Sequence, residues 1–258
     1  MRTLMYHDIA HVGLREAVGF PGPLAARYKL APDAFAAHLD ALAATGLRVG
    51  TLDAGSASGA VAPQLVLSFD DGGASALLAA AELERHGWRG QFFITTARID
   101  TPGFLTREEL RELAARGHLI GGHSHTHPTY MGRLTRAELD GEWSISHALL
   151  AEILGKPPRT ASVPGGYLSH EVIDTAASAG YELLFTSEPT ARVAHRAIPV
   201  RGRYTIWSTT PARVAAAYAR GERLAGGRLW LEWNAKKLAK RTSPSVYQAL
   251  RRVRARRS

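Results

Sequence analysis

Short hydrophobic runs alternate with segments of helical periodicity along most of the chain. The runs predict strands over residues 3–7, 65–69, 90–94, 119–122, 160–163, 183–186 and 197–200. The spacing of apolar positions predicts helices over residues 34–45, 75–85, 106–116, 135–154 and 169–179. A capping box at Thr106 and Glu109 marks the beginning of one of these helices. Strand–helix alternation indicates a parallel sheet with helices outside it, so the pattern predicts an α/β fold, a distorted (β/α)7-type barrel in a single domain.

Length and composition agree with this fold and exclude several classes of protein. The chain has 258 residues, which suits one α/β barrel. It contains no cysteine, which excludes disulfides, cysteine-based zinc sites and a cysteine nucleophile. The beginning of the chain lacks the apolar stretch of a signal peptide, and no apolar run has the length of a transmembrane helix. These features predict a cytoplasmic protein.

The net charge of +9 is concentrated at the end of the chain. Residues 234–258 hold nine Lys or Arg residues and no Asp or Glu, and the remaining 23 basic residues equal the 23 acidic ones. The charge pattern therefore predicts two parts, a barrel over residues 1–210 and a helical, basic C-terminal extension over residues 211–258.

Two explanations of the basic extension remain open. Trp230 and Trp233 precede the basic run, and aromatic residues followed by a basic, partly amphipathic helix are typical of a segment on an anionic membrane surface. This explanation places the protein peripherally at the inner membrane face. A solvated helix end with a frayed tail explains the same residues equally well. No nucleic-acid partner is expected, because the basic run lacks a recognisable recognition fold.

Residues with the chemistry of a metal site follow two of the predicted strands. Asp70 and Asp71 come directly after the second strand, and His123, His125 and His127 come directly after the fourth. In such barrels functional groups collect where strands end, and carboxylate and imidazole ligands together suit a metal site that keeps a water. Taken singly, an Asp-Asp-Gly sequence is often only a turn, and three close histidines are rarer.

These two motifs resemble those of the polysaccharide deacetylase family, the metal-dependent N-deacetylases of chitin-like glycans and peptidoglycan. The SFDDG sequence at residues 68–72 fits the first motif of that family, and the HSHTH sequence at residues 123–127 fits its second. The resemblance covers residues 1–200. It implies that Asp70 is the general base and that Asp71, His123 and His127 bind the metal. His125 lies at a variable position of the motif, so the resemblance gives it a supporting or structural role.

The resemblance also assigns a role to the first strand. Common members of the family carry a catalytic histidine on a late strand, and His195 does not fit that motif. The LMYHD sequence at residues 4–8 instead resembles the circularly permuted members, such as poly-N-acetylglucosamine deacetylases, in which the equivalent strand comes first. His7 is therefore the candidate that protonates the leaving amine. Alone, a histidine at this position would usually be structural.

The chain departs from the family pattern at the third and fourth motifs. Ser162, in the SVPGG sequence, stands where many members have the arginine that pairs with the base. This substitution leaves the groups that orient Asp70 unidentified. Trp207 is a weak candidate for the fourth motif and could equally belong to the core. The turn after Ser162 contributes two weak candidates for oxyanion or substrate binding, the backbone N–H of Gly165 and the side chain of Tyr167.

Together these residues predict a hydrolase that removes N-acetyl groups from the amino sugars of a poly- or oligosaccharide, such as a lipid-linked or exopolysaccharide precursor. One divalent metal is expected, with zinc first and cobalt, nickel or iron as alternatives. Two other functions remain open: a related amidohydrolase of a small N-acyl or N-formyl substrate, and a non-catalytic glycan-binding protein on the same fold. Serine hydrolases and nucleotide-binding proteins are disfavoured, because their motifs are absent from the sequence.

Overall fold

The computed structural model describes residues 1–53, 62–166, 168–189, 192–194, 196–227, 229–231 and 234. Its strands are β1 (Arg2–Tyr6), β2 (Leu65–Phe69), β3 (Gln91–Ile94), β4 (Leu119–Gly122), β5 (Thr160–Ser162), β6 (Leu183–Thr186), β7 (Arg192–Ala194), β8 (Pro199–Gly202) and β9 (Tyr204–Thr205). Its α-helices are α1 (Pro23–Ala26), α2 (Pro32–Ala43), α3 (Ala76–Arg85), α4 (Arg107–Ala115), α5 (Arg136–Leu154), α6 (His170–Ser178) and α7 (Ala212–Arg220). The described residues also form the 3-10 helices η1 (Val12–Leu14), η2 (Thr96–Arg98), η3 (Met131–Arg133) and η4 (Pro164–Gly166).

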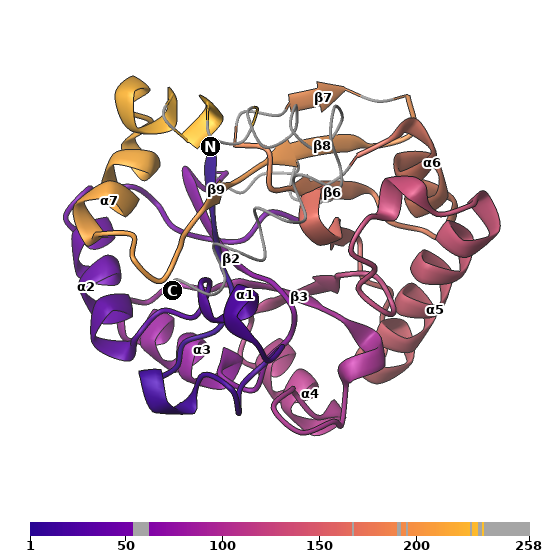
Figure 1. Ribbon diagram of the computed structural model, residues 1–258, viewed down its shortest axis with the longest axis horizontal. Helices are drawn as coiled ribbons and strands as arrows, with labels where there is room; N and C mark the ends of the chain where they lie inside the picture. Colours follow the sequence, from indigo (N-terminus) through magenta and orange to yellow (C-terminus); the bar gives the residue numbers. More distant parts are fainter. Residues whose placement is uncertain are drawn as a thin grey trace.

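The strands form one sheet that closes almost completely into a barrel. Their order is β7-β8-β6-β5-β4-β3-β2-β1-β9, and every neighbouring pair is parallel except β7 with β8. A single residue, Arg203, separates β8 from β9, although β8 pairs with β6 and β9 pairs with β1. The chain at Arg203 therefore joins the two sides of the barrel. Figure 1 shows helices α2 to α7 arranged outside the strands. The predicted α/β barrel is confirmed.

The predicted elements lie close to their observed positions. Each of the seven predicted strands overlaps an observed one, and β7 and β9 are additional. The predicted capping box is present at Thr106 and Glu109, and a second one joins Thr135 and Glu138 at the beginning of α5. In each box the threonine hydroxyl accepts from the backbone N–H of the glutamate, whose carboxylate accepts from the threonine N–H. These bonds satisfy amides that a helix leaves without partners at its beginning.

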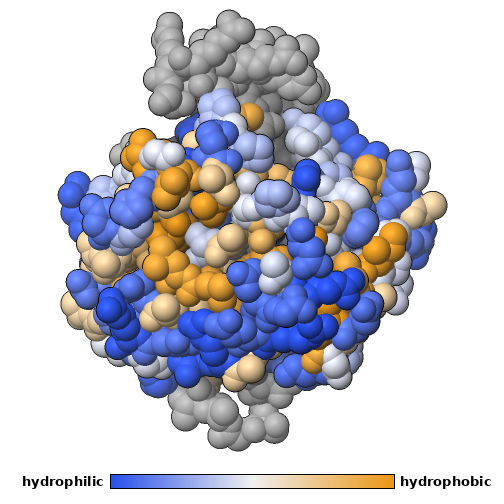
Figure 2. Space-filling view, turned by 90° about the horizontal axis from the view of Figure 1, so that it is seen from below, coloured by the Kyte–Doolittle hydropathy of each residue, from blue (hydrophilic) through white to orange (hydrophobic). Residues whose placement is uncertain are grey.

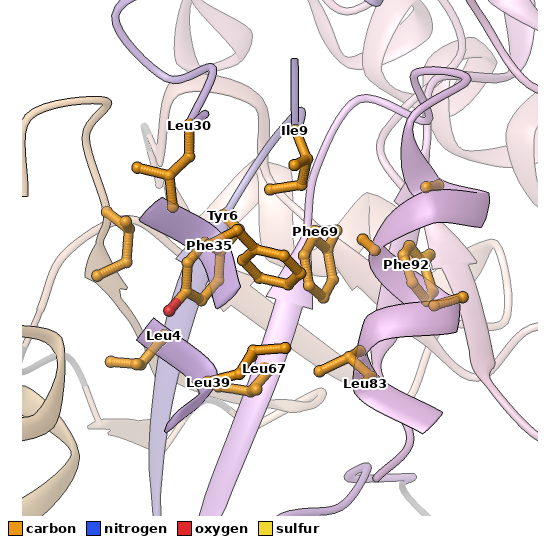
Figure 3. Close-up of a cluster of buried hydrophobic side chains, with 14 of the residues drawn as sticks. Leu4, Tyr6, Ile9, Leu30, Phe35, Leu39, Leu67, Phe69, Leu83 and Phe92 are labelled. Atoms are coloured by element: carbon orange, nitrogen blue, oxygen red, sulfur yellow. The ribbon is translucent and has the colours of Figure 1, made fainter. Parts of the chain in front are cut away.

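The main hydrophobic core lies between the sheet and the helices outside it. Tyr6 of β1 stacks on Phe69 of β2, which in turn stacks on Phe92 of β3, with ring centroids 5.5 and 4.8 Å apart. Figure 3 shows these three rings together with Phe35 of α2 and Leu83 of α3. Because side chains alternate along a strand, the residues next to these in sequence point into the barrel. Ser68 and Phe93 take such positions, and so a few polar groups can lie inside the barrel.

The end of the described chain packs on the same core as the barrel. Ala215, Tyr218 and Ala219 of α7 and Leu229 belong to the main cluster, while Leu224, Trp230 and Leu231 are exposed. Gly221, directly after α7, lies against the Arg2 side chain at the beginning of β1. This segment is therefore at the opposite end of β1 from His7. Most of residues 234–258 lie outside the described residues, so the proposed membrane contact and the division at residue 210 stay predictions.

Part of the surface of the barrel is hydrophobic. Figure 2 shows hydrophobic residues gathered among hydrophilic ones on the face seen from below. Large exposed hydrophobic residues of the barrel include Val12, Leu14 and Leu78. Over the part of the chain that the structure describes, no helix combines the length and the apolar character needed to cross a bilayer.

Candidate metal centre and active site

The three predicted metal ligands, Asp71, His123 and His127, come together where β2 and β4 end. Asp71 follows β2, and His123 directly follows β4. Asp71 Oδ1 lies 3.5 Å from His123 Nε2 and 3.4 Å from His127 Nε2. One ligand atom from each of the three residues lies within 4.8 Å of the others, so they form a group that could hold one metal ion.

The chemistry of these three groups fits a divalent cation. Asp71 Oδ1 is buried and, among the described residues, has no hydrogen-bond partner. Burial, together with the nearby carboxylates of Asp70 and Asp8, raises the pKa of Asp71 well above its ordinary value. Burial also lowers the pKa of His123 to about 3 and lowers that of His127, which leaves both imidazoles neutral with a lone pair to donate. A bound cation would supply the partner that the Asp71 oxygen lacks.

The orientation of His123 is fixed by its other ring nitrogen. His123 Nδ1 lies 2.9 Å from the backbone carbonyl oxygen of Ser162, which directs Nε2 toward Asp71. Such a bond from the second nitrogen is typical of metal-binding histidines, because it sets both the tautomer and the ring orientation. Ser162 thus supports the site through its backbone, although it replaces the arginine of the related motif.

The backbone around the ligands adopts a conformation that is unfavourable for most residues. Asp71, Ser124 and His127 have φ values of 79°, 60° and 61°. Residues other than glycine persist in this left-handed region only where their surroundings impose it. Part of that constraint comes from Glu142 of α5. Its carboxylate accepts from the N–H groups of His125 and Thr126, each at 2.8 Å, and from the Thr126 hydroxyl at 2.5 Å.

We predict that Glu142→Ala weakens metal binding although Glu142 is not a ligand. Loss of three hydrogen bonds releases the turn that carries His127, so the dissociation constant for zinc should rise roughly 10- to 100-fold, the range seen for groups that orient metal ligands. Competition with a chromogenic chelator measures this constant. Glu152→Ala, on the exposed side of the same helix, is the matched control and should bind zinc like the wild type. Equal affinity in Glu142→Ala would contradict the prediction.

Asp70 points into the barrel and is held by the arginine at the junction of β8 and β9. Arg203 Nη1 lies 2.7 Å from Asp70 Oδ1, and Nη2 lies 2.8 Å from Oδ2. Nη2 also donates to the Ser162 hydroxyl at 2.6 Å. Burial alone would raise the pKa of Asp70, but the Arg203 guanidinium and the nearby His123 hold that pKa well below its ordinary value. Asp70 is therefore ionised and fixed in orientation.

Arg203 is the group that sequence reasoning left unidentified. Its side chain is completely buried, and its guanidinium carbon lies 5.4 Å and 5.9 Å from the ring centroids of Phe93 and Phe185. Ser162 marks the position where the related motif has an arginine, and here the positive charge comes from the junction between β8 and β9. The sequence contains only a weak signal for this pairing, because Arg203 is far from Asp70 along the chain.

His7 lies at the end of β1, beside Tyr28, and its ring centroid is 4.3 Å from the Tyr28 centroid. Its Nδ1 atom is buried and has no hydrogen-bond partner within the described ranges. Burial lowers the pKa of His7 to about 4, although the negative charge of Asp70 acts to raise it. His7 is therefore neutral at pH 7 in the metal-free protein, whereas the proposed proton donor must be protonated when the amine leaves.

The titration of His7 tests this environment directly. In metal-free protein, the imidazole resonances of His7 should titrate with a midpoint near pH 4, well below a histidine in water. Asp70→Asn should lower the midpoint further, because the Asp70 carboxylate favours the protonated imidazole. Two-dimensional NMR, with His7→Gln to assign the resonances, makes the measurement. A midpoint near 6.5 would show that His7 is more accessible to water than the structure indicates.

The remaining candidate residues from the sequence differ in their surroundings. His125 Nδ1 lies 3.0 Å from the Thr96 hydroxyl, and its backbone is held by Glu142, which agrees with a supporting role. Gly165 lies in the turn after β5 with a φ of 64°, and its predicted role stays a prediction. Tyr167 and His195 lie outside the described residues. Trp207 stacks on Tyr28, with centroids 4.6 Å apart, and is thereby placed near His7.

The fold and the site thus define an α/β barrel with a candidate metal centre at the ends of its strands. Residues 59–184 match the family model "Polysaccharide deacetylase", and through this segment the chain belongs to the polysaccharide deacetylase family. The chain is 27% identical over 128 residues to the putative polysaccharide deacetylase YxkH of Bacillus subtilis. That match covers 49% of this chain and 46% of YxkH, so the chain spans about half the length of this relative.

Solved structures share the fold. The polysaccharide deacetylase BC0361 from Bacillus cereus matches with a TM-score of 0.71 and 20% identity, over 84% of this chain and 68% of that one. IcaB from Ammonifex degensii matches with a TM-score of 0.67 and 20% identity, over 85% of this chain and 97% of that one. At such identity the likeness concerns the fold. The expected family and barrel are confirmed.

Proposed function

We propose that this protein is a metal-dependent deacetylase that removes N-acetyl groups from the amino sugars of a poly- or oligosaccharide. One observation carries the proposal: an ionised, buried carboxylate, Asp70, lies against a group of three ligands for a metal. Asp70 Oδ2 is 3.9 Å from Nε2 of His123, and Asp70 is not needed to complete the group of Asp71, His123 and His127. Two neighbouring carboxylates therefore have different surroundings and different roles.

Asp71, His123 and His127 would hold the metal, with zinc as the first choice. When bound, a divalent metal supplies a lowered pKa for water and polarises the acetamide carbonyl. Asp70 accepts the proton of the attacking water, and its orientation is set by the two bonds from Arg203. Because Arg203 lowers the pKa of Asp70, the carboxylate is ionised and free to accept that proton.

His7 donates a proton to the amine nitrogen as the carbon–nitrogen bond breaks. Its neutral resting state means that it must gain this proton during the reaction. The proton that Asp70 accepts from the water meets this need: its transfer to His7 restores the Asp70 carboxylate, whose negative charge favours the protonated imidazole. Tyr28 contacts the imidazole ring and fixes the direction of the donation.

Metal content is the first property to measure. Protein purified without chelator or added metal should contain about one divalent ion per chain, and His127→Ala should lose it, because two ligands are too few for a closed site. Inductively coupled plasma mass spectrometry measures the metal. His86→Ala, at a half-buried histidine directly after α3, is the control. A wild type that retains no metal, even after zinc or cobalt is added, would favour a non-catalytic glycan-binding protein.

Acetate release tests the reaction itself. The zinc-loaded wild type should release acetate from N-acetylglucosamine oligosaccharides, and an equal amount of free amine should form. Small N-acetyl and N-formyl amino sugars form the second arm of the assay. Release from these small compounds alone would replace the proposal by a small-molecule amidohydrolase. Retained metal with no product in either arm would contradict both activities.

A further inference from the structure

Three arginines stack on aromatic rings in the loops around the candidate site. Arg27, directly after α1, lies with its guanidinium carbon 5.1 Å from the Trp207 ring centroid. Arg98 of η2 lies 5.2 Å from the Phe20 centroid. Arg133 of η3 lies 5.0 Å from the Tyr130 centroid. These arginines follow β1, β3 and β4, so they lie at the end of the barrel that carries the metal ligands.

Two of these stacks reach the proposed catalytic groups through ring contacts. The Trp207 ring lies against Tyr28, and Tyr28 lies against His7, with centroid distances of 4.6 and 4.3 Å. On the other side, the Phe20 ring lies 4.9 Å from the ring of His127. Arg27 is therefore two rings away from His7, and Arg98 is one ring away from His127. A sugar chain with one residue at the metal would extend past one or both guanidinium groups.

The positive charge of these arginines is not compensated. Within the part of the chain that the structure describes, Arg27, Arg98 and Arg133 form no ion pair with a carboxylate. By contrast, the two arginines of α4 and Arg116 directly after it all pair with acidic residues, including Glu152, Glu108 and Glu84. A cleft with charge of one sign attracts ligands of the opposite sign.

Acidic residues close to these loops are already engaged. Glu142 accepts three hydrogen bonds from the turn of residues 125–126, and Glu16 accepts from the N–H of Gly22. Glu188, which follows β6, also has a partner. A guanidinium that stacks on a ring with its face keeps its N–H groups at the edge, where they can donate to a carboxylate or a phosphate as a pair. Arg98 is exposed, and Arg27 and Trp207 are half-buried, so all three are accessible.

We infer that the substrate is an anionic glycan, in which a carboxylate or a phosphate next to the N-acetylated sugar binds Arg27 or Arg98. This inference rests on the proposed deacetylase function and deepens it by naming the chemical class of the substrate. Both anions share the same recognition by guanidinium groups, and the experiment separates them.

The experiment compares the zinc-loaded full chain on three probes with the same acetamido group. They are a heparosan tetrasaccharide, which carries uronate, UDP-N-acetylglucosamine, which carries phosphate, and neutral N-acetylated chitotetraose. At low salt, kcat/KM for one of the anionic probes should exceed that for the neutral one about tenfold, and added salt should reduce this ratio. The preferred anionic probe identifies the source of the charge. A ratio near one, or a preference for the neutral probe, overturns the inference.

Substitutions of the arginines test which of them binds the anionic group of the substrate. Arg27→Gln and Arg98→Gln remove one charge each and keep a hydrogen-bonding side chain, and at least one of them should lower the anionic-to-neutral ratio about tenfold. Arg223→Gln removes an exposed charge after α7, at the opposite end of the barrel, and should leave the ratio unchanged. An unchanged ratio in both site variants overturns the inference.

A binding measurement separates this inference from the proposed function. The quenching of tryptophan fluorescence on titration with each probe gives Kd without any reaction. If no probe loses acetate, but the heparosan tetrasaccharide or UDP-N-acetylglucosamine binds and Arg27→Gln or Arg98→Gln weakens that binding about tenfold, the deacetylase function fails and anionic recognition stands. If acetate is released equally from all probes, the function stands and the inference fails.

Discussion

Asp70→Asn should lower kcat/KM for acetate release by roughly 10²- to 10⁴-fold, the usual contribution of a positioned general base. Asparagine has nearly the same shape, but it cannot take a proton from the attacking water. Because Asp70 is not one of the three ligand residues, the variant should still bind about one zinc ion per chain. Steady-state acetate release and metal content, measured on the same preparation, test both parts of the prediction.

Folding of the Asp70→Asn variant needs its own control. Asparagine leaves the Arg203 guanidinium without its counter-charge, so part of any loss could come from a displaced arginine. The circular dichroism spectrum and the zinc content establish that the site is still assembled. Asp40→Asn, a carboxylate with most of its surface exposed on α2, is the matched substitution and should retain full activity. Activity close to wild type in Asp70→Asn would remove Asp70 from the role of base.

The two motifs that hold the metal ligands could be recognised in the sequence because each one is a short, continuous stretch of the chain. Asp70 and Asp71 directly follow a hydrophobic run, and the histidines directly follow another, so a parallel sheet brings the two strand ends together. Capping boxes are similarly local, and the one at Thr106 is found where the sequence indicates it. For such features the chain order and the fold class are enough to bring the motifs together, whereas the choice of His127 over His125 as a ligand came from the family resemblance.

Arg203 could not be predicted because its role depends on how the barrel closes. The predicted strand over residues 197–200 ends before it, and β9 is too short to stand out as a hydrophobic run. An arginine between two strands would normally point to solvent. Here β8 pairs with β6 while β9 pairs with β1, and this junction turns Arg203 into the barrel. Only the three-dimensional closure makes that position an interior one.

The protonation state of His7 was also beyond sequence reasoning. Its place at the end of the first strand follows from the hydrophobic pattern, and the family resemblance suggests a proton donor. The low pKa arises from burial, which depends on packing by Tyr28 and on the loop between β1 and α2. Glu142 was missed for a related reason, since a glutamate within a helix has no local feature that marks it as a partner of the histidine turn.

Arg203→Met should be the most destabilising of the substitutions considered. It leaves the Asp70 carboxylate buried without a partner, and breaking a buried pair in this way costs about 3–5 kcal/mol. Methionine fills much of the space between Phe93 and Phe185, so most of the loss is electrostatic. Urea unfolding of metal-free protein at pH 7 measures the free energy of unfolding for the wild type, for Arg203→Met and for Asp70→Asn with Arg203→Met.

The pH dependence distinguishes a lost charge partner from lost packing. In the wild type the folded pKa of Asp70 is lowered, so the pair stabilises the fold above the unfolded pKa, which is about 3.9, and this stability is lost as the pH falls below it. In Arg203→Met, burial without the guanidinium raises the folded pKa of Asp70, so its protonation stabilises the fold at low pH and that stability is lost as the pH rises. The gap between the two proteins should therefore narrow from pH 7 to pH 5. The double variant, which has neither charge, should be more stable than Arg203→Met at pH 7. A gap that stays constant with pH, together with a double variant no more stable than the single one, would assign the loss to packing alone.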